Sequence, residues 1–259
     1  MNFSFYVGAL GAKGSSDKMS VLANNLANIN NNGFKPKTAV FTDLLNYNLN
    51  DSENAVTDLQ AGNGVRVQRT NTNFSLSGIT QTGAALDYTI MQDNAFFMLQ
   101  NPQTGEISYT RSGHFHEGEM EDGFYLMTDT GKYVLDEDGE PILLDMLDVE
   151  KIAASMEGEE VEDDETEEDE EDVQKVGVYT FTNPSHLLSS GDNEYVAGEG
   201  MTPELVENPG LMTGALETSG TDLAREMTRV IECQRAFSYA LKMVQTSDEI
   251  ESTINSLRG

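Results

Sequence analysis

The chain has 259 residues and a formal net charge of −30, with 15 basic residues against 45 acidic ones. That length accommodates one large domain or two modest ones, each with a buried core. The acidic excess argues against binding to a phosphate backbone or to an anionic lipid surface. The single cysteine, Cys233, excludes an internal disulfide framework and a cysteine-based zinc site.

The acidic excess is concentrated in one short tract. Residues 157–172 hold 13 acids in 16 positions, whereas residues 1–35 sum to +2 and residues 217–259 to −2. A tract of this composition cannot bury apolar surface and its charges repel one another, so we predict a disordered loop inserted between two strands. The two ends are together neutral, which makes them the part of the chain best suited to protein–protein contact.

The first 30 residues carry a seam of small and apolar residues with a seven-residue repeat. Its positions alternate in steps of three and four: Phe5, Gly8, Ala12, Ser15, Met19, Leu22, Leu26 and Ile29. Six Asn among residues 24–32 form a poor helix interior, and Gly33 supplies a stop, so the pattern predicts a helix over residues 3–30. Neither a cleavable signal peptide nor an apolar run of membrane-spanning length is legible, so we expect a protein that is soluble or exported without cleavage.

In the middle of the chain the period of the apolar pattern changes from about 3.6 to 2. Short stretches with this pattern predict strands at residues 86–91, 95–100, 107–112, 124–128, 132–135, 141–144 and 176–181. The segments between them are rich in Asn, Asp and Gly, which tolerate the positive φ angles of tight turns. Short strands joined by tight turns predict a small antiparallel β domain.

The last 40 residues mirror the first. Ser219 with Asp222 resembles a helix capping box. An apolar seam again steps by four and three and then slips by one residue: Leu223, Met227, Val230, Gln234, Phe237, Leu241 and Val244, followed by Ile250, Ile254 and Leu257. Three pairs of opposite charge at i,i+3 add a few tenths of a kcal/mol each at best: Asp222–Arg225, Glu226–Arg229 and Glu232–Arg235.

These patterns predict an α+β fold in which long N- and C-terminal helices pair as a coiled coil beside a central, mainly antiparallel β domain. We divide the chain into an N-terminal helix (1–33), an extended linker (34–75), a β-rich domain with the acidic insertion (76–217) and a C-terminal helix (218–259). Two interpretations of the seams remain open. In the first, the helices pack on the β domain as ordinary core. In the second, they pair with each other and contact neighbouring subunits. An intramolecular coiled coil alone would satisfy the same pattern.

An enzymatic function finds little support in the residues. His114 and His116 could form a metal pair on one strand face, but a third and fourth ligand are not identifiable, and a solvated hairpin face is the favoured interpretation. No nucleophile triad, P-loop or dinucleotide fingerprint is legible. We therefore predict no catalytic, cofactor-binding or metal site, and keep a metal-dependent hydrolase and a monomeric binding module as alternatives from other classes.

Several motifs together resemble the bacterial flagellar rod and hook proteins. The segment LANNLANINNNGFK at residues 22–35 is similar to the Asn-rich signature that closes the first helix of that family. FTDLL (41–45), GNGV (62–65), LDYTI (86–90), the paired Phe at 96–97 and YTRSGHF (109–115) follow in the family's order. GALETS (214–219), EMT (226–228) and QRAF (234–237) match its last block. The chain departs from the family at Ala95, at Ser219-Gly220 and in the acidic insertion.

The resemblance implies a non-enzymatic structural subunit of the flagellar basal body. Such proteins assemble helically with further copies and with other rod and hook proteins, pair their termini in an inner layer, and transmit torque from motor to hook. They leave the cell through the flagellar export apparatus without signal cleavage, and no contact with nucleic acid or insertion into a membrane is implied. The compact length and residues 215–228 look most like a distal rod protein, with a proximal rod protein or a short hook-type protein as alternatives.

We assign two sets of residues on this basis. The first is the set expected to carry axial assembly: Leu22, Leu26, Ile29, Leu223, Met227, Val230, Phe237, Leu241 and Val244. The second is the set that matches the family motifs: Asn24, Asn25, Asn28, Gly33, Phe34, Glu217, Ser219, Glu226, Gln234 and Arg235.

Overall fold

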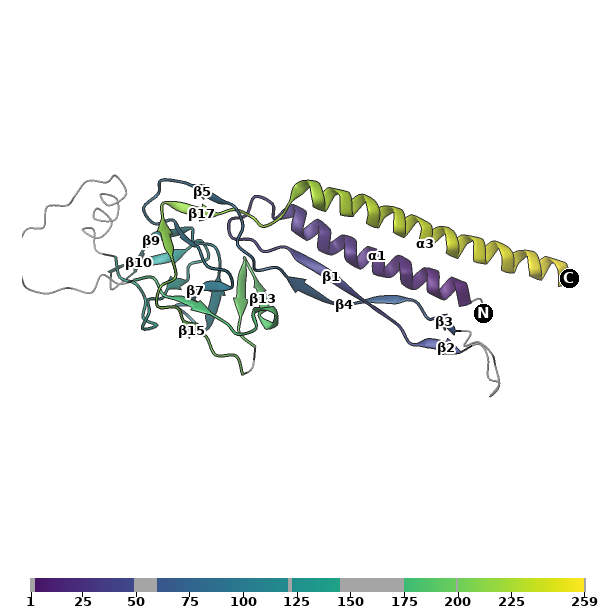
Figure 1. Cartoon of the computed structure of the whole chain (residues 1–259), viewed down its shortest axis with the longest axis horizontal. Helices are drawn as coiled ribbons and strands as arrows, with labels where there is room; N and C mark the ends of the chain where they lie inside the picture. The colour runs from purple at the N-terminus through teal and green to yellow at the C-terminus, as the bar shows by residue number, and fades with distance from the viewer. Residues whose placement is uncertain (1–2, 49–59, 121–122, 145–174, 199, 259) are drawn as a thin grey trace, which may run out of the picture. The chain divides into compact units, whose positions relative to one another are not determined.

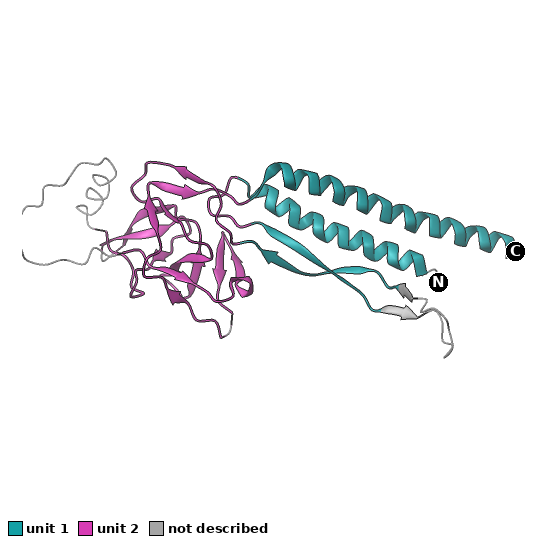
Figure 2. Ribbon diagram, in the orientation of Figure 1, with its two compact units in different colours: residues 1–29, 36–73, 221–259 teal, residues 30–35, 74–220 magenta. Residues whose placement is uncertain are grey.

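A computed structural model of the chain describes residues 3–48, 60–120, 123–144, 175–198 and 200–258. The acidic tract at 157–172, predicted to be a disordered loop, lies outside these residues. The chain divides into two compact units (Figure 2). Unit 1 holds residues 1–29, 36–73 and 221–259, and unit 2 holds residues 30–35 and 74–220. Within the described part of the chain, no helix combines the length and the hydropathy needed to cross a bilayer.

Two helices from opposite ends of the chain lie side by side in unit 1 and run antiparallel (Figure 1). They are α1 (Phe3–Ala27) and α3 (Leu223–Arg258). Both terminal helices and the α+β class are as predicted, but α1 ends at Ala27 and not at residue 30. The run of Asn there is the reason, because Asn side chains compete for backbone hydrogen bonds and favour turns over helix.

The first turn of α3 is capped by Asp222. Its Oδ1 accepts a hydrogen bond from the backbone N–H of Arg225 at 3.2 Å. The predicted capping box on Ser219 is therefore wrong, because the helix begins at Leu223 and the N-cap is the residue directly before it. Two of the predicted i,i+3 ion pairs are present, Asp222–Arg225 at 3.9 Å and Glu226–Arg229 at 2.7 Å.

Unit 1 also contains an antiparallel strand ladder where the sequence predicts only an extended linker. β1 (Lys37–Asp43) pairs with β4 (Val65–Thr72), with an irregularity in register between Val40 and Phe41. β2 (Asn46–Asn48) pairs with β3 (Gln60–Gly62). β1 and β4 carry Thr, Asn, Gln, Arg and Lys at many positions, which blurs the period-2 signal.

Unit 2 is built on a nine-stranded antiparallel sheet with β7 at its centre. The path runs β13-β14-β8-β7-β11-β10-β9, with β12 pairing both β7 and β15. The bounds are β7 (Ala95–Gln100), β8 (Ile107–Thr110), β9 (Phe115–Met120), β10 (Gly123–Thr128), β11 (Tyr133–Val134), β12 (Val178–Thr180), β13 (Leu188–Gly191), β14 (Glu194–Val196) and β15 (Glu204–Leu205).

Two short antiparallel pairs complete unit 2. β5 (Ile79–Gln81) pairs with β17 (Ala215–Glu217), and β6 (Tyr88–Ile90) pairs with β16 (Leu211–Thr213). A 3-10 turn, η1 (Pro184–His186), precedes β13. The predicted strand at 141–144 is wrong as a strand, because it contributes only isolated bridges, Leu135↔Pro141 and Tyr125↔Leu143.

The core of unit 2 lies on both faces of β7. Alternate residues of this strand point into two different apolar clusters, with Ala95, Phe97 and Leu99 in one and Phe96 and Met98 in the other. Four of these five side chains are completely buried. A strand that is buried on both faces reads as a continuous apolar run, which is how β7 appears in the sequence.

Candidate assembly surface

The two terminal helices approach closely at the small residues of α1. A Cβ atom added at Gly8 would lie 3.0 Å from Val244 Cγ2 and 3.3 Å from the Ala240 carbonyl oxygen. Gly8 and Ala12 are both buried. The small half of the α1 seam therefore faces α3, where the close approach leaves no room for larger side chains.

Three polar contacts lie along the same interface. Ser4 Oγ is 2.8 Å from Ser247 Oγ, and the Cys233 thiol donates to the Ser15 carbonyl oxygen at 3.0 Å. Burial raises the pKa of the Cys233 thiol, although Lys18 acts in the opposite direction. The third contact joins Asn25 and Glu226, described next. Residue numbers rise along α1 as their partners' numbers fall along α3, so these contacts fix one antiparallel register.

Asn25 connects three segments of unit 1 from a completely buried position. Its Nδ2 donates to the Lys37 carbonyl oxygen at 2.7 Å and to Glu226 Oε2 at 3.3 Å, and its Oδ1 accepts from the Lys37 N–H at 2.9 Å. Glu226 is buried as well and pairs with Arg229 through its other oxygen at 2.7 Å. Two residues of the predicted family motif thus meet in one satisfied polar network.

The stripe of α3 that faces α1 differs in phase from the predicted seam. It consists of residues at steps of four and three: Glu226, Val230, Cys233, Phe237, Ala240, Val244 and Ser247. Of the predicted assembly residues, Val230, Phe237 and Val244 belong to it. Leu223, Met227 and Leu241 do not, being 50%, 52% and 41% exposed. The prediction was wrong at alternate positions because it followed the large apolar residues. Where the helices approach closely, the alternate positions hold small or polar residues: Glu226, Cys233, Ala240 and Ser247.

Large apolar side chains instead follow two other lines along α3. Flank A consists of Leu223, Met227, Ile231 and Leu241, and flank B consists of Tyr239, Met243, Ile250, Ile254 and Leu257. Each of these side chains is at least 41% exposed. At 3.6 residues per turn, the flanks lie about 100° to either side of the α1-facing stripe. A helix with apolar residues on several faces is typical of one that is buried on several faces.

Helix α1, in contrast, is covered on two sides within unit 1. A Cβ at Gly14 would lie 3.2 Å from Phe41 Cε1 of β1, and Lys18 Nζ stands 5.9 Å from the centroid of the same ring. The three predicted assembly residues near its C-terminal end are buried or half-buried: Leu22, Leu26 and Ile29. The first turns of α1 expose Phe3, Phe5 and Tyr6, so the large exposed apolar side chains of the helix pair lie on α3 and at the N-terminal end of α1.

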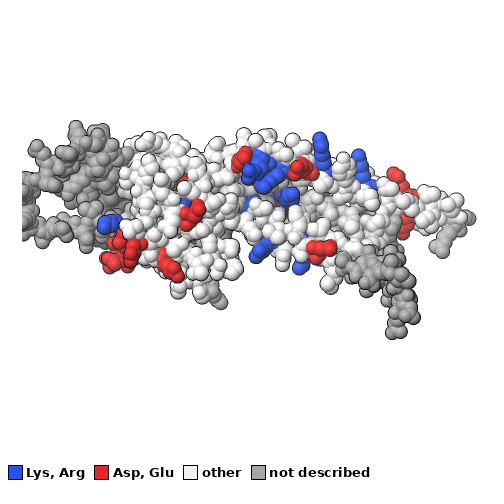
Figure 3. Space-filling model, in the orientation of Figure 1, with Lys and Arg blue, Asp and Glu red and all other residues white. Residues whose placement is uncertain are grey.

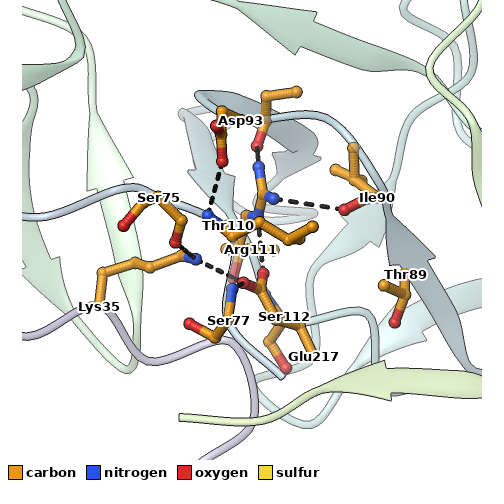
Figure 4. A network of polar contacts seen from close by, with 12 residues as sticks. Lys35, Ser75, Ser77, Thr89, Ile90, Asp93, Thr110, Arg111, Ser112 and Glu217 are labelled. Carbon is orange, nitrogen blue, oxygen red and sulfur yellow. Dashed lines mark hydrogen bonds and ion pairs between the residues drawn. The ribbon is translucent and has the colours of Figure 1, made fainter. Parts of the chain in front are cut away.

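A second group of motif residues forms a buried ion network in unit 2 (Figure 4). Glu217 Oε1 accepts from Lys35 Nζ at 2.5 Å, and Glu217 Oε2 accepts from Arg111 Nε at 2.7 Å. All three residues are at most 2% exposed. Lys35 Nζ also donates to the Ser75 carbonyl oxygen, and the two terminal nitrogens of Arg111 donate to the carbonyl oxygens of Ala95 and Ile90.

Burial and charge oppose each other in this network. Burial alone would raise the pKa of Glu217, but the two cations Arg111 and Lys35 together hold it below its ordinary value of 4.5. For Lys35, burial is the larger effect and lowers its pKa, while Glu217 acts in the opposite direction. The carboxylate is therefore the charge on which both cations depend.

Gly33 and Phe34 fix the chain beside this network. Gly33 has φ +67°, and a Cβ there would lie 2.6 Å from the Ser112 nitrogen, so only glycine fits. The Gly33 N–H donates to the Glu217 carbonyl oxygen at 2.8 Å, and the Gly220 N–H donates to the Phe34 carbonyl oxygen at 2.9 Å.

The other motif residues lie nearer the surface. Asn24, Gln234 and Arg235 are exposed, Asn28 Nδ2 donates to the Asn24 carbonyl oxygen, and Ser219 is half-buried. Lys35 and Arg111, both inside quoted motifs, were not singled out from the sequence. The available signal was that the family motifs contain two cations, Lys35 and Arg111, and an anion, Glu217, that could form an ion pair.

The two histidines of the alternative metal hypothesis are engaged separately. His114 Nδ1 lies 2.8 Å from Asp87 Oδ1, and His116 Nδ1 lies 3.6 Å from Asp129 Oδ1. Among the described residues, no group of three or more His, Cys, Asp and Glu side chains is arranged to hold a metal ion.

Comparison with known proteins gives one consistent family. Residues 212–257 match the family described as "Flagellar basal body rod FlgEFG protein C-terminal". Over 269 residues the chain is 30% identical to the flagellar basal-body rod protein FlgG of Bacillus subtilis (strain 168), covering 98% of each chain.

Two further relatives are similar over nearly their whole length. The chain is 27% identical over 267 residues to the FlgG of Buchnera aphidicola subsp. Baizongia pistaciae (strain Bp), covering 98% of this chain and 99% of that one. It is 28% identical over 261 residues to the flagellar basal-body rod protein FlgF of Mesorhizobium japonicum (strain LMG 29417 / CECT 9101 / MAFF 303099), covering 99% and 98%.

Proposed function

Since the chain belongs to the flagellar basal-body rod protein family, and is a structural rod subunit of the basal body, we propose that it builds the distal part of the rod. In this proposal the chain self-assembles helically through its paired terminal helices, joins other rod and hook proteins, and transmits torque from motor to hook. It performs no catalysis, and it reaches the rod through the flagellar export apparatus.

The observation that carries the proposal is the exposed apolar surface of α3. Flanks A and B place nine large apolar side chains, each at least 41% exposed, on one helix. Fully burying one such side chain contributes roughly 1.5–3 kcal/mol, so leaving all of them in water is costly unless another molecule covers them. Neighbouring subunits of a rod would supply that cover. A coiled-coil geometry of α1 with α3 is part of the proposal.

The assembly residues predicted from the sequence take two roles in this proposal. Val230, Phe237 and Val244 hold α3 on α1, together with Leu22, Leu26 and Ile29. Leu223, Met227 and Leu241 contact other subunits. The first set maintains the helix pair as a unit, and the second set makes the surface that the unit presents.

The test is a complementation experiment in the source bacterium lacking the gene. Met243→Asp places a charge in flank B, whereas Ala224→Asp places the same charge at an exposed position outside both flanks. We expect Met243→Asp to be produced and exported but to leave basal bodies with incomplete rods, and Ala224→Asp to restore motility. Complete rods with Met243→Asp would contradict the role of flank B, and absence of the parent chain from isolated rods would contradict the function itself.

Two alternatives stay distinguishable. A proximal rod or short hook-type position within the same family would be revealed by the stage at which the rod stops growing in the deletion strain. A monomeric binding module would sediment as a monomer at every concentration and would not copurify with basal bodies.

A further inference from the structure

Flanks A and B repeat the same spacing at different heights on α3. Leu223, Met227 and Leu241 of flank A have counterparts in flank B that lie 16 residues further along: Tyr239, Met243 and Leu257. At 1.5 Å per residue, the displacement is about 24 Å along the helix. The two flanks lie on opposite sides of the stripe that faces α1. Each side of α3 therefore carries a line of apolar side chains with the same spacing, and the line of flank B lies nearer the C-terminal end.

The two flanks also complement each other between the matched positions. Flank B has Ile250 and Ile254 where flank A, 16 residues lower, has Gln234 and Ser238. Ile250 and Ile254 of flank B thus stand opposite side chains of smaller volume in flank A, which leaves room for the two helix surfaces to interdigitate.

We propose that flank B of one copy packs against flank A of a second, parallel copy displaced by about 16 residues, or about 24 Å, along α3. This inference rests on the proposed function and names the partner and the register of the same surface. Because the two contacting surfaces differ, the interface is head-to-tail, and each copy keeps one unused flank for the next copy. A head-to-tail interface forms a closed ring only if the rotation between copies returns the last copy to the first. Otherwise it adds copies without end, which is what the wall of a helical tube requires.

The charged residues Arg235 and Glu249 lie outside the proposed contact between the flanks. Arg235 and Glu249 are both exposed and lie on the side of α3 away from α1. Glu249 lies about five full turns beyond Ile231 and therefore on the side of flank A, so the copy that presents flank B does not direct Glu249 at Arg235 of its neighbour. Figure 3 shows basic side chains at several places over unit 1 and acidic ones near the C-terminal end of α3, with uncharged surface between them.

Cysteine cross-linking in assembled basal bodies tests the register. The variant carries Met227→Cys and Met243→Cys in a Cys233→Ser background, and both new thiols replace side chains that are 52% and 54% exposed. Within one chain the two positions lie about 24 Å apart on a straight helix and cannot form a disulfide. On oxidation we expect a ladder of covalent oligomers with the double variant and only monomer with each single variant.

Matched controls decide between registers. Met227→Cys with Ile254→Cys misaligns the thiols by about 16 Å in the proposed packing and should give no ladder. Dimers from Met243→Cys alone would place the copies at the same height and overturn the proposal. A ladder from the misaligned pair equal to that from the matched pair would overturn it too.

The same cross-linking experiment separates the register from the proposed function. Presence of the chain in isolated rods without a ladder from the matched pair would contradict the register and would still support the proposed function. Absence of the chain from isolated rods would contradict that function.

Discussion

Glu217 shows how one buried carboxylate organises a site in unit 2. Two cations, Lys35 and Arg111, reach it from segments far apart in the sequence, and the three side chains are at most 2% exposed. Buried charges are tolerated when they are paired and hydrogen-bonded, and removing one partner leaves the others uncompensated. The network therefore couples residues 30–35 to the end of β17 and makes their docking depend on a single side chain.

We predict that Glu217→Gln destabilises the full-length chain by about 3–5 kcal/mol, because two buried cations lose their counter-charge. Urea unfolding followed by circular dichroism measures the change. Glu204→Gln is the matched control, since Glu204 is exposed on β15 and its substitution should stay within about 0.5 kcal/mol. Equal effects of the two substitutions would contradict the assigned role of the network.

The same carboxylate predicts a pH dependence. The folded-state pKa of Glu217 lies below its ordinary value of 4.5, so its contribution is fully present above about pH 4.5 and is lost as the pH falls through the folded pKa. The stability difference between the parent chain and Glu217→Gln should therefore shrink as the pH falls from 7 to 3. Urea midpoints of both proteins across this range give the difference, and an increase toward acid would contradict the account.

Two glycines of α1 differ in what surrounds them. Gly8 faces Val244 and the backbone of Ala240 at 3.0 and 3.3 Å from an added Cβ, whereas at Gly11 the nearest atom is Ala240 Cβ at 3.8 Å. We predict that Gly8→Ala destabilises the helix pair by about 1–3 kcal/mol through overpacking. Gly11→Ala should stabilise it by up to about 1 kcal/mol, since alanine is the better helix former.

Far-ultraviolet circular dichroism during thermal unfolding compares these two variants, and motility of complemented cells supplies an independent readout. The opposite signs are the informative part, because both changes add the same methyl group to the same helix. A stabilising Gly8→Ala would mean that α3 does not approach α1 as closely as the structure places it.

The helix seams illustrate what sequence reasoning can and cannot provide at this scale. The α1 seam was predicted through Gly8 and Ala12, because small residues at seven-residue spacing are typical of a close helix–helix contact. The α3 seam was predicted correctly at Val230, Phe237 and Val244 and one residue off at the alternate positions, with Met227, Gln234 and Leu241 in place of Glu226, Cys233 and Ala240. Glu226 and Cys233 face α1 only because Asn25 and the Ser15 carbonyl oxygen accommodate them. Apolar periodicity carries no information about such specific polar partners.

Across the whole molecule, the strands with the strongest apolar signal were the predictable ones. β7 and β10 follow their predicted ranges within one residue, while β1 and β4 were missed because polar residues cover their faces. The family motifs located Gly33, Phe34 and Glu217 without revealing that they share one network. Long-range ion pairs of this kind depend on topology, which a local pattern does not encode.

The acidic tract supports one prediction for the complete chain. Residues 157–172 combine a strong like charge with almost no apolar side chains, so we expect them to act as a solvated spacer. Deleting them should leave folding and rod assembly largely intact, as judged by motility and by the yield of basal bodies. Loss of rod growth from a deletion variant that is still soluble and exported would identify the tract as an interaction site.

A helical reconstruction of the rod in basal bodies isolated from the source bacterium tests the central claim directly. We predict that this chain lies in the rod wall and that each α3 contacts α3 helices of other copies through both flanks, with neighbours displaced by about 24 Å. A rod that lacks the chain, or one in which flanks A and B face solvent, would contradict the account.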